Sequence, residues 1–363
     1  MNYSKKGIKE RQKSLHASSH KWSKKLLLAV MNLMVLGILA IGVIGASAGI
    51  GVFKGIIDTA PSIENIDVTP TGFSTFVYDL EGNQIGKLIA QDSNRIPVAK
   101  DMIPENLAHA FVAIEDERFY EHNGIDIKGI IRAAYVGISN GFHFTEGAST
   151  ITQQLLKNTV FTDWTSEGNN KIKKIKRKIQ EQYLALEITK YYSKDEILLR
   201  YMNAINLGQN TLGVESASLR YFGKHCSELT ISECAVIASI TQNPSKYNPI
   251  RHPEENVKRR KKCLTKMLEL GFITQAQYDE AMADTDAVYE RIGLYDIDYQ
   301  EANATTGSYF SDAVYEQVKQ DLILAGYNET MAETLLTSGG LRVESTLDPK
   351  IQNILNEEYA DAS

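Results

Sequence analysis

The stretch that decides the fold is AFVAIEDERFYEHNGID, residues 110–126. Counting by threes and fours from Leu107 puts Phe111 and Ile114 on one face of a predicted helix. Glu115 lies four residues after Phe111 and borders this apolar stripe, where partial desolvation would raise the pKa of its carboxylate. The stretch alone leaves two interpretations open: a charge cluster at a helix end on the surface, or a carboxylate prepared for chemistry.

A second polar stretch is EGASTITQQLLKN, residues 146–158. Ser149 is the predicted N-cap of a helix. Four of its polar residues are Thr150, Gln154, Lys157 and Asn158. The first three follow one another at spacings of four and three, so they share a helical face that ends in a cation. Such a face can hydrogen-bond a sugar or a phosphate, and an ordinary solvated face is the alternative.

A basic helix is predicted over KIKKIKRKIQEQYLALEITK, residues 171–190. Glu181 follows Arg177 by four residues and Lys178 by three, so two cations are expected to flank it and lower its pKa. The apolar residues expected to face the core are Ile172, Ile175, Ile179, Tyr183 and Leu186. A surface ion-pair helix, or a basic patch on anionic lipid headgroups, is the alternative.

The N-terminal part of the chain predicts a membrane anchor. Residues 1–25 carry eight Lys or Arg against one Glu, so they are +7 and the remainder of this −6 chain is −13. Residues 26–53 hold no charge, and about 20 apolar residues suffice for a spanning helix. The positive-inside rule then places residues 1–25 in the cytoplasm and the bulk of the chain outside the cell membrane. A cleaved signal peptide is the alternative interpretation of this segment.

Composition excludes several classes of protein. The charge asymmetry does not fit a nucleic-acid binder, so no nucleic-acid partner is expected. The three cysteines are odd in number and lack metal-ligand spacing, and the seven histidines are scattered, so neither a disulfide framework nor a zinc site is predicted. A β hairpin is expected over residues 73–89, a helix from Pro253 that ends at Gly271, and a short strand at LRVEST.

Five stretches in this order resemble the signature motifs of the peptidoglycan glycosyltransferase family, the transglycosylase domains of class A penicillin-binding proteins. They are EDERFYEHNGID, GASTITQQLLKN, RKIQEQYLALE, residues 194–224, and RRKKCLTKML from residue 259. The resemblance covers roughly residues 73–290. The segments GSYFSDAV and GGLRVESTLDPKIQNIL resemble the linker into a transpeptidase domain, but no serine nucleophile motif of that domain follows. The chain is therefore expected to be either a truncated form or a natural monofunctional one.

The resemblance implies a mainly α, lysozyme-like two-lobed glycosyltransferase domain with an N-terminal transmembrane helix and a small β hairpin ahead of the domain. The expected organisation is a basic cytoplasmic tail (1–25), a transmembrane helix (26–53), a stalk with the hairpin (54–95), the glycosyltransferase domain (96–290), and a linker that begins a missing transpeptidase region (291–363). One lobe is expected to dip into the outer leaflet, through apolar residues drawn from Ile130, Ile131, Tyr135, Phe142 and Phe144, for which a plain core is the alternative.

The resemblance also implies an activity: polymerisation of lipid II, with inversion at the anomeric carbon and release of undecaprenyl pyrophosphate. Glu115 and Glu181 would be the family's two key carboxylates, with Glu115 as the base. The residues expected to bind substrate are Asp116, Phe119, His122, Ser149, Thr150, Gln154, Lys157, Asn158, Arg177 and Lys178. Glu181 is a candidate ligand for a divalent cation, Mg²⁺ or Mn²⁺, and no organic cofactor is expected.

The expected partners are lipid II, the nascent glycan strand, membrane lipids and other proteins of cell-wall synthesis or division. Two other functions stay open. A lysozyme-like lytic enzyme would use a similar glutamate but would not need a dense cluster of cations. A non-catalytic membrane scaffold would not need Glu115 and Glu181.

Overall fold

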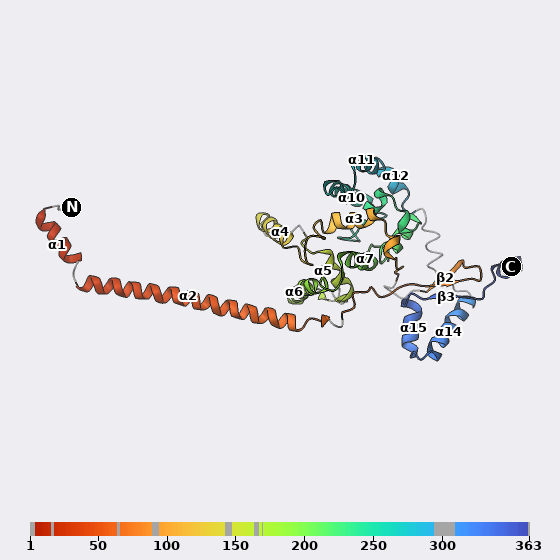
Figure 1. Cartoon of the computed structure of the whole chain (residues 1–363), viewed down its shortest axis with the longest axis horizontal. Coiled ribbons are helices and arrows are strands. Elements are labelled where there is room, and N and C mark those ends of the chain that lie inside the picture. Colours follow the sequence, from red (N-terminus) through yellow and green to blue (C-terminus); the bar gives the residue numbers. More distant parts are fainter. Residues whose placement is uncertain are drawn as a thin grey trace. The chain divides into compact units, whose positions relative to one another are not determined.

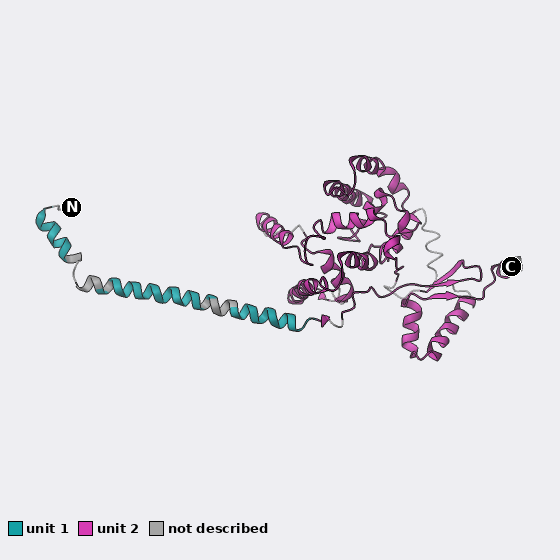
Figure 2. Ribbon diagram, viewed as in Figure 1, with its two compact units in different colours: residues 1–60 teal, residues 61–363 magenta. Residues whose placement is uncertain are grey.

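The structure, a computed structural model, describes residues 4–15, 18–63, 66–88, 94–141, 147–162, 167–168, 170–293 and 309–361. The chain divides into two compact units, residues 1–60 and 61–363 (Figure 2).

The first unit consists of two helices, α1 (Lys5–Leu15) and α2 (Ser18–Asp58). Along α2, apolar side chains such as Leu33 and Ile38 are exposed. Within the described residues, no helix combines the length and the apolarity that crossing a membrane requires. The structure therefore does not support the transmembrane helix predicted over 26–53. The side chains of residues 41 and 43–46, inside that predicted span, lie outside the described set.

The second unit is mainly helical (Figure 1). Its helices up to the middle of the unit are η2 (Lys100–Met102), α3 (Glu105–Glu115), α4 (Ile127–Ser139), α5 (Ile151–Thr159), α6 (Lys171–Ile188), α7 (Lys194–Ala204) and α8 (Val214–Phe222). They are followed by η4 (Cys226–Glu228), α9 (Ile231–Ala238), α10 (Pro253–Glu269), α11 (Gln275–Ala283), α12 (Thr285–Glu290), α14 (Tyr309–Leu324), α15 (Glu329–Ser338) and α16 (Pro349–Asp361). The mainly α prediction is confirmed for the described residues.

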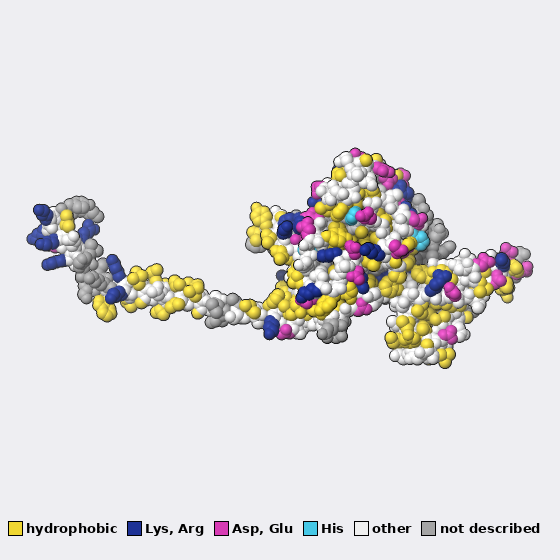
Figure 3. All heavy atoms as spheres, viewed as in Figure 1, with side chains coloured by type: hydrophobic (Ala, Val, Ile, Leu, Met, Phe, Trp, Pro, Cys, Tyr) yellow, Lys and Arg dark blue, Asp and Glu magenta, His cyan; other side chains and the backbone are white. Residues whose placement is uncertain are grey.

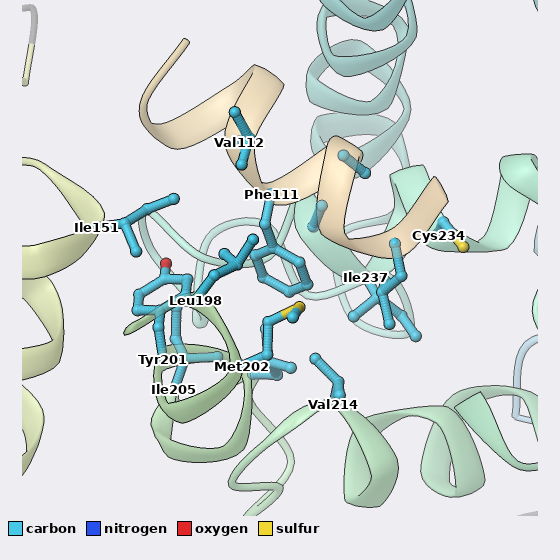
Figure 4. Close-up of a cluster of buried hydrophobic side chains, with 14 of the residues drawn as sticks. Phe111, Val112, Ile151, Leu198, Tyr201, Met202, Ile205, Val214, Cys234 and Ile237 are labelled. Carbon is cyan, nitrogen blue, oxygen red and sulfur yellow. The ribbon is translucent and has the colours of Figure 1, made fainter. Parts of the chain in front are cut away.

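The core forms around α3. Its buried residues include Leu107, Ala110 and Phe111, which recur at the predicted helical spacing. Helix α3 packs against α9 and α10, and α5 packs against α7. The ring of Phe111 meets that of Tyr201 edge to face at a centroid distance of 5.9 Å (Figure 4). The C-terminal end of α3, which carries Glu115, is therefore held by several helices that are distant in sequence.

A small sheet joins the two ends of the second unit. Strands β1 (Thr75–Tyr78) and β2 (Gln84–Leu88) form the predicted hairpin, with a register shift between Val77 and Tyr78. Strand β3 (Arg342–Glu344) pairs parallel with β1, giving the order β2-β1-β3. Helix α15 packs on this sheet. The strand predicted at LRVEST is confirmed, and it pairs with a strand more than 260 residues away.

Helix α6 buries a different face from the predicted one. Ile172 and Ile175 are 80 % and 59 % exposed, so their prediction as core is wrong. The buried residues are instead Gln180, Glu181, Leu184, Ala185 and Ile188. This face turns inward because Leu184, Ala185 and Ile188 join the main apolar cluster. Glu181 lies on this buried face as well. Its burial is tolerated because the neighbouring cations pair with its carboxylate.

Helix α4 presents an apolar face to solvent. Ile127, Ile131, Tyr135 and Ile138 are each more than 60 % exposed, and they recur at helical spacing. Figure 3 shows the apolar side chains gathered over this helix. The alternative of a plain core is therefore wrong for Ile131 and Tyr135. Ile130 is half-buried, and Phe142 and Phe144 lie outside the described residues.

Candidate active site

A groove of about 870 Å³ lies beside the C-terminal end of α3. We call it the Glu115 groove. Its charged lining residues are the basic Arg132, Lys157, Arg177, Lys178, Lys258, Arg259, Lys262 and Lys266, and the acidic Glu115, Asp116, Glu117, Glu181 and Glu255. Basic residues outnumber acidic ones by eight to five among these, so the groove favours an anionic ligand.

Glu115 is the last residue of α3, and its side chain is only 9 % exposed. Gln154 Nε2 donates to its Oε2 at 2.7 Å, and Arg259 Nη2 donates to its Oε1 at 2.7 Å. The Thr241 hydroxyl also donates to Oε1. The carboxylate is nearly buried, as its place beside the apolar stripe predicts. Polar donors from α5 and α10 also surround it, because α3 ends where those helices converge.

Asp116 turns away from its neighbour Glu115. Its side chain is 3 % exposed and contacts His122 Nε2 at 2.9 and 3.0 Å from the two carboxylate oxygens. The backbone N–H of Ile151, the first residue of α5, donates to Asp116 Oδ2 at 3.0 Å. Asp116 thus joins the end of α3 to the start of α5, although it also lines the Glu115 groove.

Phe119 and His122 were predicted to shape the wall of the site. The structure instead places them behind the residues that line the Glu115 groove. Phe119 is fully buried in the core, and His122 is held by Asp116. Neither lines the Glu115 groove. Their helical spacing from Glu115 misleads because α3 ends at that residue, so the chain beyond it no longer follows the same face.

Helix α5 begins one residue later than predicted. Thr150, not Ser149, is the N-cap, in a capping box with Gln153. The Thr150 hydroxyl also donates to the backbone oxygen of Gly124 at 2.6 Å, so it is buried and does not face the groove. Ser149 lines the groove and accepts a hydrogen bond from Lys178 Nζ at 2.7 Å.

The rest of the predicted polar face of α5 divides between two cavities. Gln154 and Lys157 line the Glu115 groove. Asn158 lines an adjoining cavity of about 800 Å³, which shares Gln154, Lys157, Thr241 and Gln242 with the groove. Gln154 therefore bonds to Glu115 directly, Lys157 lines the same groove, and Asn158 lines the adjoining cavity.

The cation cluster on α6 is ordered around a buried carboxylate. Glu181 is fully buried, and its two oxygens accept hydrogen bonds from Arg177 Nη1 and, at 3.0 Å, from Lys178 Nζ. Arg177 Nε also donates to Glu167 Oε1 at 2.8 Å. Burial opposes the charge of Arg177, but its bonds to Glu167 and Glu181 outweigh burial and raise its pKa. Arg177 therefore stands in the groove as a fixed cation.

Comparison with known proteins identifies the family. The model of the transglycosylase family matches residues 81–268, just over half of the chain. The chain belongs to the transglycosylase family. The matched part contains Glu115, Glu181 and the helices α3 to α9, together with α10 up to Leu268.

Curated relatives of this transglycosylase include penicillin-binding proteins. Penicillin-binding protein 1A of Clostridium botulinum (strain Hall) is 39 % identical over 322 residues, which cover 85 % of this chain and 37 % of that protein. The protein of the same name from Clostridium perfringens (strain 13) is 35 % identical, covering 97 % and 51 %. Penicillin-binding protein 1A/1B of Bacillus subtilis is 33 % identical, covering 92 % and 33 %. The chain spans a third to a half of the length of these relatives.

A crystal structure of penicillin-binding protein 1A from Haemophilus influenzae covers 78 % of this chain, and this chain covers 28 % of that one, at 22 % identity and a TM-score of 0.33. So low a TM-score carries no argument about the fold. The lysozyme-like two-lobed arrangement therefore stays a prediction.

Two residues of the candidate site were missed from the sequence. Arg259 opens the fifth quoted motif, yet nothing in the motif said which of its basic residues would reach Glu115, 144 positions earlier. Thr241 precedes a turn-rich loop and carried no signal of its own. Both contacts depend on how α9 and α10 pack against α3.

The described residues do not fit the divalent cation for which Glu181 was a candidate ligand. Both oxygens of Glu181 are occupied by basic side chains. No group of three or more His, Cys, Asp or Glu able to hold a metal ion lies within the part of the chain that the structure describes.

Proposed function

We propose that this transglycosylase polymerises lipid II into peptidoglycan glycan strands, with inversion at the anomeric carbon and release of undecaprenyl pyrophosphate. The observation that carries the proposal is the placement of Glu115 and the α6 cations in one groove. The reaction needs a base for the acceptor's 4-hydroxyl and positive charge for the departing pyrophosphate. The groove offers both.

Glu115 is the proposed base. A carboxylate offers about four acceptor positions, and the described donors Gln154, Thr241 and Arg259 occupy three. One position remains for the acceptor hydroxyl, whose proton the carboxylate would take as the oxygen attacks. The three donors restrain the carboxylate before substrate arrives, so little reorganisation is needed in the transition state.

Lys157, Arg177 and Lys178 are the proposed partners of the pyrophosphate. Burial lowers the pKa of Lys157 below its ordinary value, while the charge of Glu181 opposes that shift. When the dianionic pyrophosphate of the donor lies in the groove, it would favour the charged form of this lysine. Glu181 would orient Arg177 and Lys178 rather than contact the reacting atoms, since both of its oxygens are engaged with them.

Membrane attachment is a further part of the proposal. Residues 26–53 carry no charge, and the exposed apolar face of α4 suits contact with lipid. Both would bring the Glu115 groove to a lipid-linked substrate. Other proteins of cell-wall synthesis or division remain proposed partners.

The test feeds labelled lipid II to the purified protein and resolves the products on a gel. We expect ladders of polymer from the wild-type chain. Glu115→Gln should remain folded and lose polymerisation by about 100-fold or more, the effect of removing a general base. The control is Glu105→Gln on the same helix, whose side chain is 86 % exposed and should not matter.

Other outcomes would contradict the proposal. Cleavage of pre-formed glycan without polymer would favour the lytic enzyme, and a folded protein with neither activity would favour the scaffold. Near-normal polymerisation by Glu115→Gln would remove Glu115 from the role of base.

A further inference from the structure

A tyrosine ring that has no role in the mechanism above contacts the cation bonded to the proposed base. Tyr247 lines the Glu115 groove. The guanidinium carbon of Arg259 lies over its ring, 5.1 Å from the centroid. This separation is within the range in which the negative face of an aromatic ring attracts a cation. The contact therefore links Tyr247, through Arg259, to Glu115.

Hydrogen bonds hold the guanidinium of Arg259 from two sides. Its Nη2 donates to Glu115 Oε1 and its Nη1 donates to Gln242 Oε1, each at 2.7 Å. Gln242 is exposed, and Arg259 Nε is buried with no hydrogen-bond partner among the described residues. Ordering so long a side chain costs conformational entropy, so a third restraint, from the ring, better defines where the guanidinium lies.

The loop that carries Tyr247 is fixed by the same helix that carries Arg259. Asn256, fully buried on α10, donates from Nδ2 to the backbone oxygen of Tyr247 at 2.7 Å. Its Oδ1 accepts a hydrogen bond from the Tyr289 hydroxyl, so both ends of the amide are engaged. Asn256 precedes Arg259 by three residues, so the two side chains are neighbours on the helix surface. Helix α10 thus positions both the guanidinium and the loop whose ring contacts it.

A second cation approaches the same ring from a more solvated position. Lys246 Nζ lies 5.1 Å from the centroid of Tyr247, and the lysine side chain is 54 % exposed. The side chain of Arg259 is 11 % exposed. A cation–π contact is stronger where the cation is shielded from water, so the ring acts mainly on Arg259. Lys246 therefore offers a control, a ring contact that does not lead to Glu115.

We propose that Tyr247 is a positioning residue for glycosyl transfer: the face of its ring holds the Arg259 guanidinium where it pairs with Glu115. The inference rests on the proposed function. It predicts that Tyr247 acts through Arg259, and not through its own hydroxyl or through contact with the substrate.

The test is a double-mutant cycle in lipid II polymerisation, with Tyr247→Leu, Arg259→Gln and the double variant. We expect Tyr247→Leu to lower kcat about 10-fold with KM nearly unchanged, because the guanidinium can then shift from its place beside the base. The double variant should lose about 100-fold, as Arg259→Gln does alone, because residues that act as a unit are not additive. Tyr247→Phe keeps the ring face and should retain most of the activity. Lys246→Gln is the matched control and should keep kcat.

A measurement without substrate tests the contact itself. Chemical denaturation of the wild type, the two single variants and the double variant gives a second cycle. In it, Tyr247→Leu should lower the free energy of unfolding less in the Arg259→Gln background than in the wild type, because the ring has then lost its cation. Equal losses in the two backgrounds would show that ring and guanidinium are not coupled, and would overturn the inference.

The kinetic results separate the other outcomes. A loss of about 1,000-fold in the double variant, the product of the two single losses, would show that Tyr247 acts independently of Arg259, for example by stacking on a sugar. Equal losses in Tyr247→Phe and Tyr247→Leu would assign the effect to the hydroxyl. Either result, or a wild-type kcat in Tyr247→Leu, would overturn the positioning role alone. A folded wild type that forms no polymer would overturn the proposed function, and the positioning role with it.

Discussion

Adjacent arginines on α10 have different surroundings. Arg259 lines the Glu115 groove and pairs with Glu115 at 2.7 Å. Arg260 points the other way, is 1 % exposed, and donates to Ser232 Oγ at 2.7 Å and to Thr285 Oγ1 at 3.0 Å. A helix turns about 100° per residue, so neighbours on α10 face different parts of the molecule. One arginine therefore belongs to the site and the other to the core.

At the scale of single residues, we predict that Arg259→Gln lowers kcat for lipid II polymerisation by about 100-fold, the cost of misplacing a catalytic group by about 1 Å. The reason is that Glu115 loses the cation that balances its nearly buried charge. Steady-state kinetics measure the effect. Lys261→Gln, an exposed neighbour, is the control, and equal kinetics for the two variants would contradict the prediction.

Among the helices, α10 holds the region around the site together. It packs against α3, α9 and α11, and Arg260 provides polar links to α9 and α11 through Ser232 and the backbone oxygen of Ala281. The helix begins at Pro253 and is followed by Gly271 at φ +72°, as the sequence predicts. The sequence did not distinguish the buried arginine from the exposed basic residues beside it.

The element-scale prediction concerns Arg260→Met. The change leaves buried oxygens of Ser232 and Ala281 without their donor, so we expect the free energy of unfolding to fall by about 2–3 kcal/mol. Chemical denaturation measures it, with Lys261→Met as the control. A midpoint equal to wild type would show that Arg260 does not stabilise the packing of α10.

On the scale of the whole second unit, the sheet links residues near its two ends. Gly340 precedes β3 with φ +70°, and a Cβ built there would lie 2.8 Å from the Cβ of Phe73. Any other residue would be strained at this position and would push against the β1 side of the sheet. None of the described side-chain partners of Glu115 belongs to the sheet.

We therefore predict that Gly340→Val makes residues 309–361 more sensitive to limited proteolysis and leaves polymerisation near the wild-type rate. The positive φ alone costs about 1–2 kcal/mol, and the contact with Phe73 adds to it. Lys350→Ala, at an 82 % exposed side chain, serves as control. Loss of polymerisation with an unchanged proteolysis pattern would contradict this separation of sheet and site.

The sequence by itself determined the features that depend on short spacing. The hairpin at β1 and β2, the limits of α10, and the contacts of Glu181 with Arg177 and Lys178 follow from residues a few positions apart. The order of the motifs also identified the family before any coordinates. Local spacing suffices for these features because a helix or a turn brings near neighbours together whatever surrounds it.

Tertiary structure decided the rest. Because of it, Arg259 pairs with Glu115, and Asp116 contacts His122 and α5. It also determines that Phe119 lies behind the site and which face of α6 is buried. These outcomes join residues separated by up to 144 positions. They could not be derived from periodicity, because the packing of α3 against α9 and α10, and of α5 against α7, sets which side chains meet.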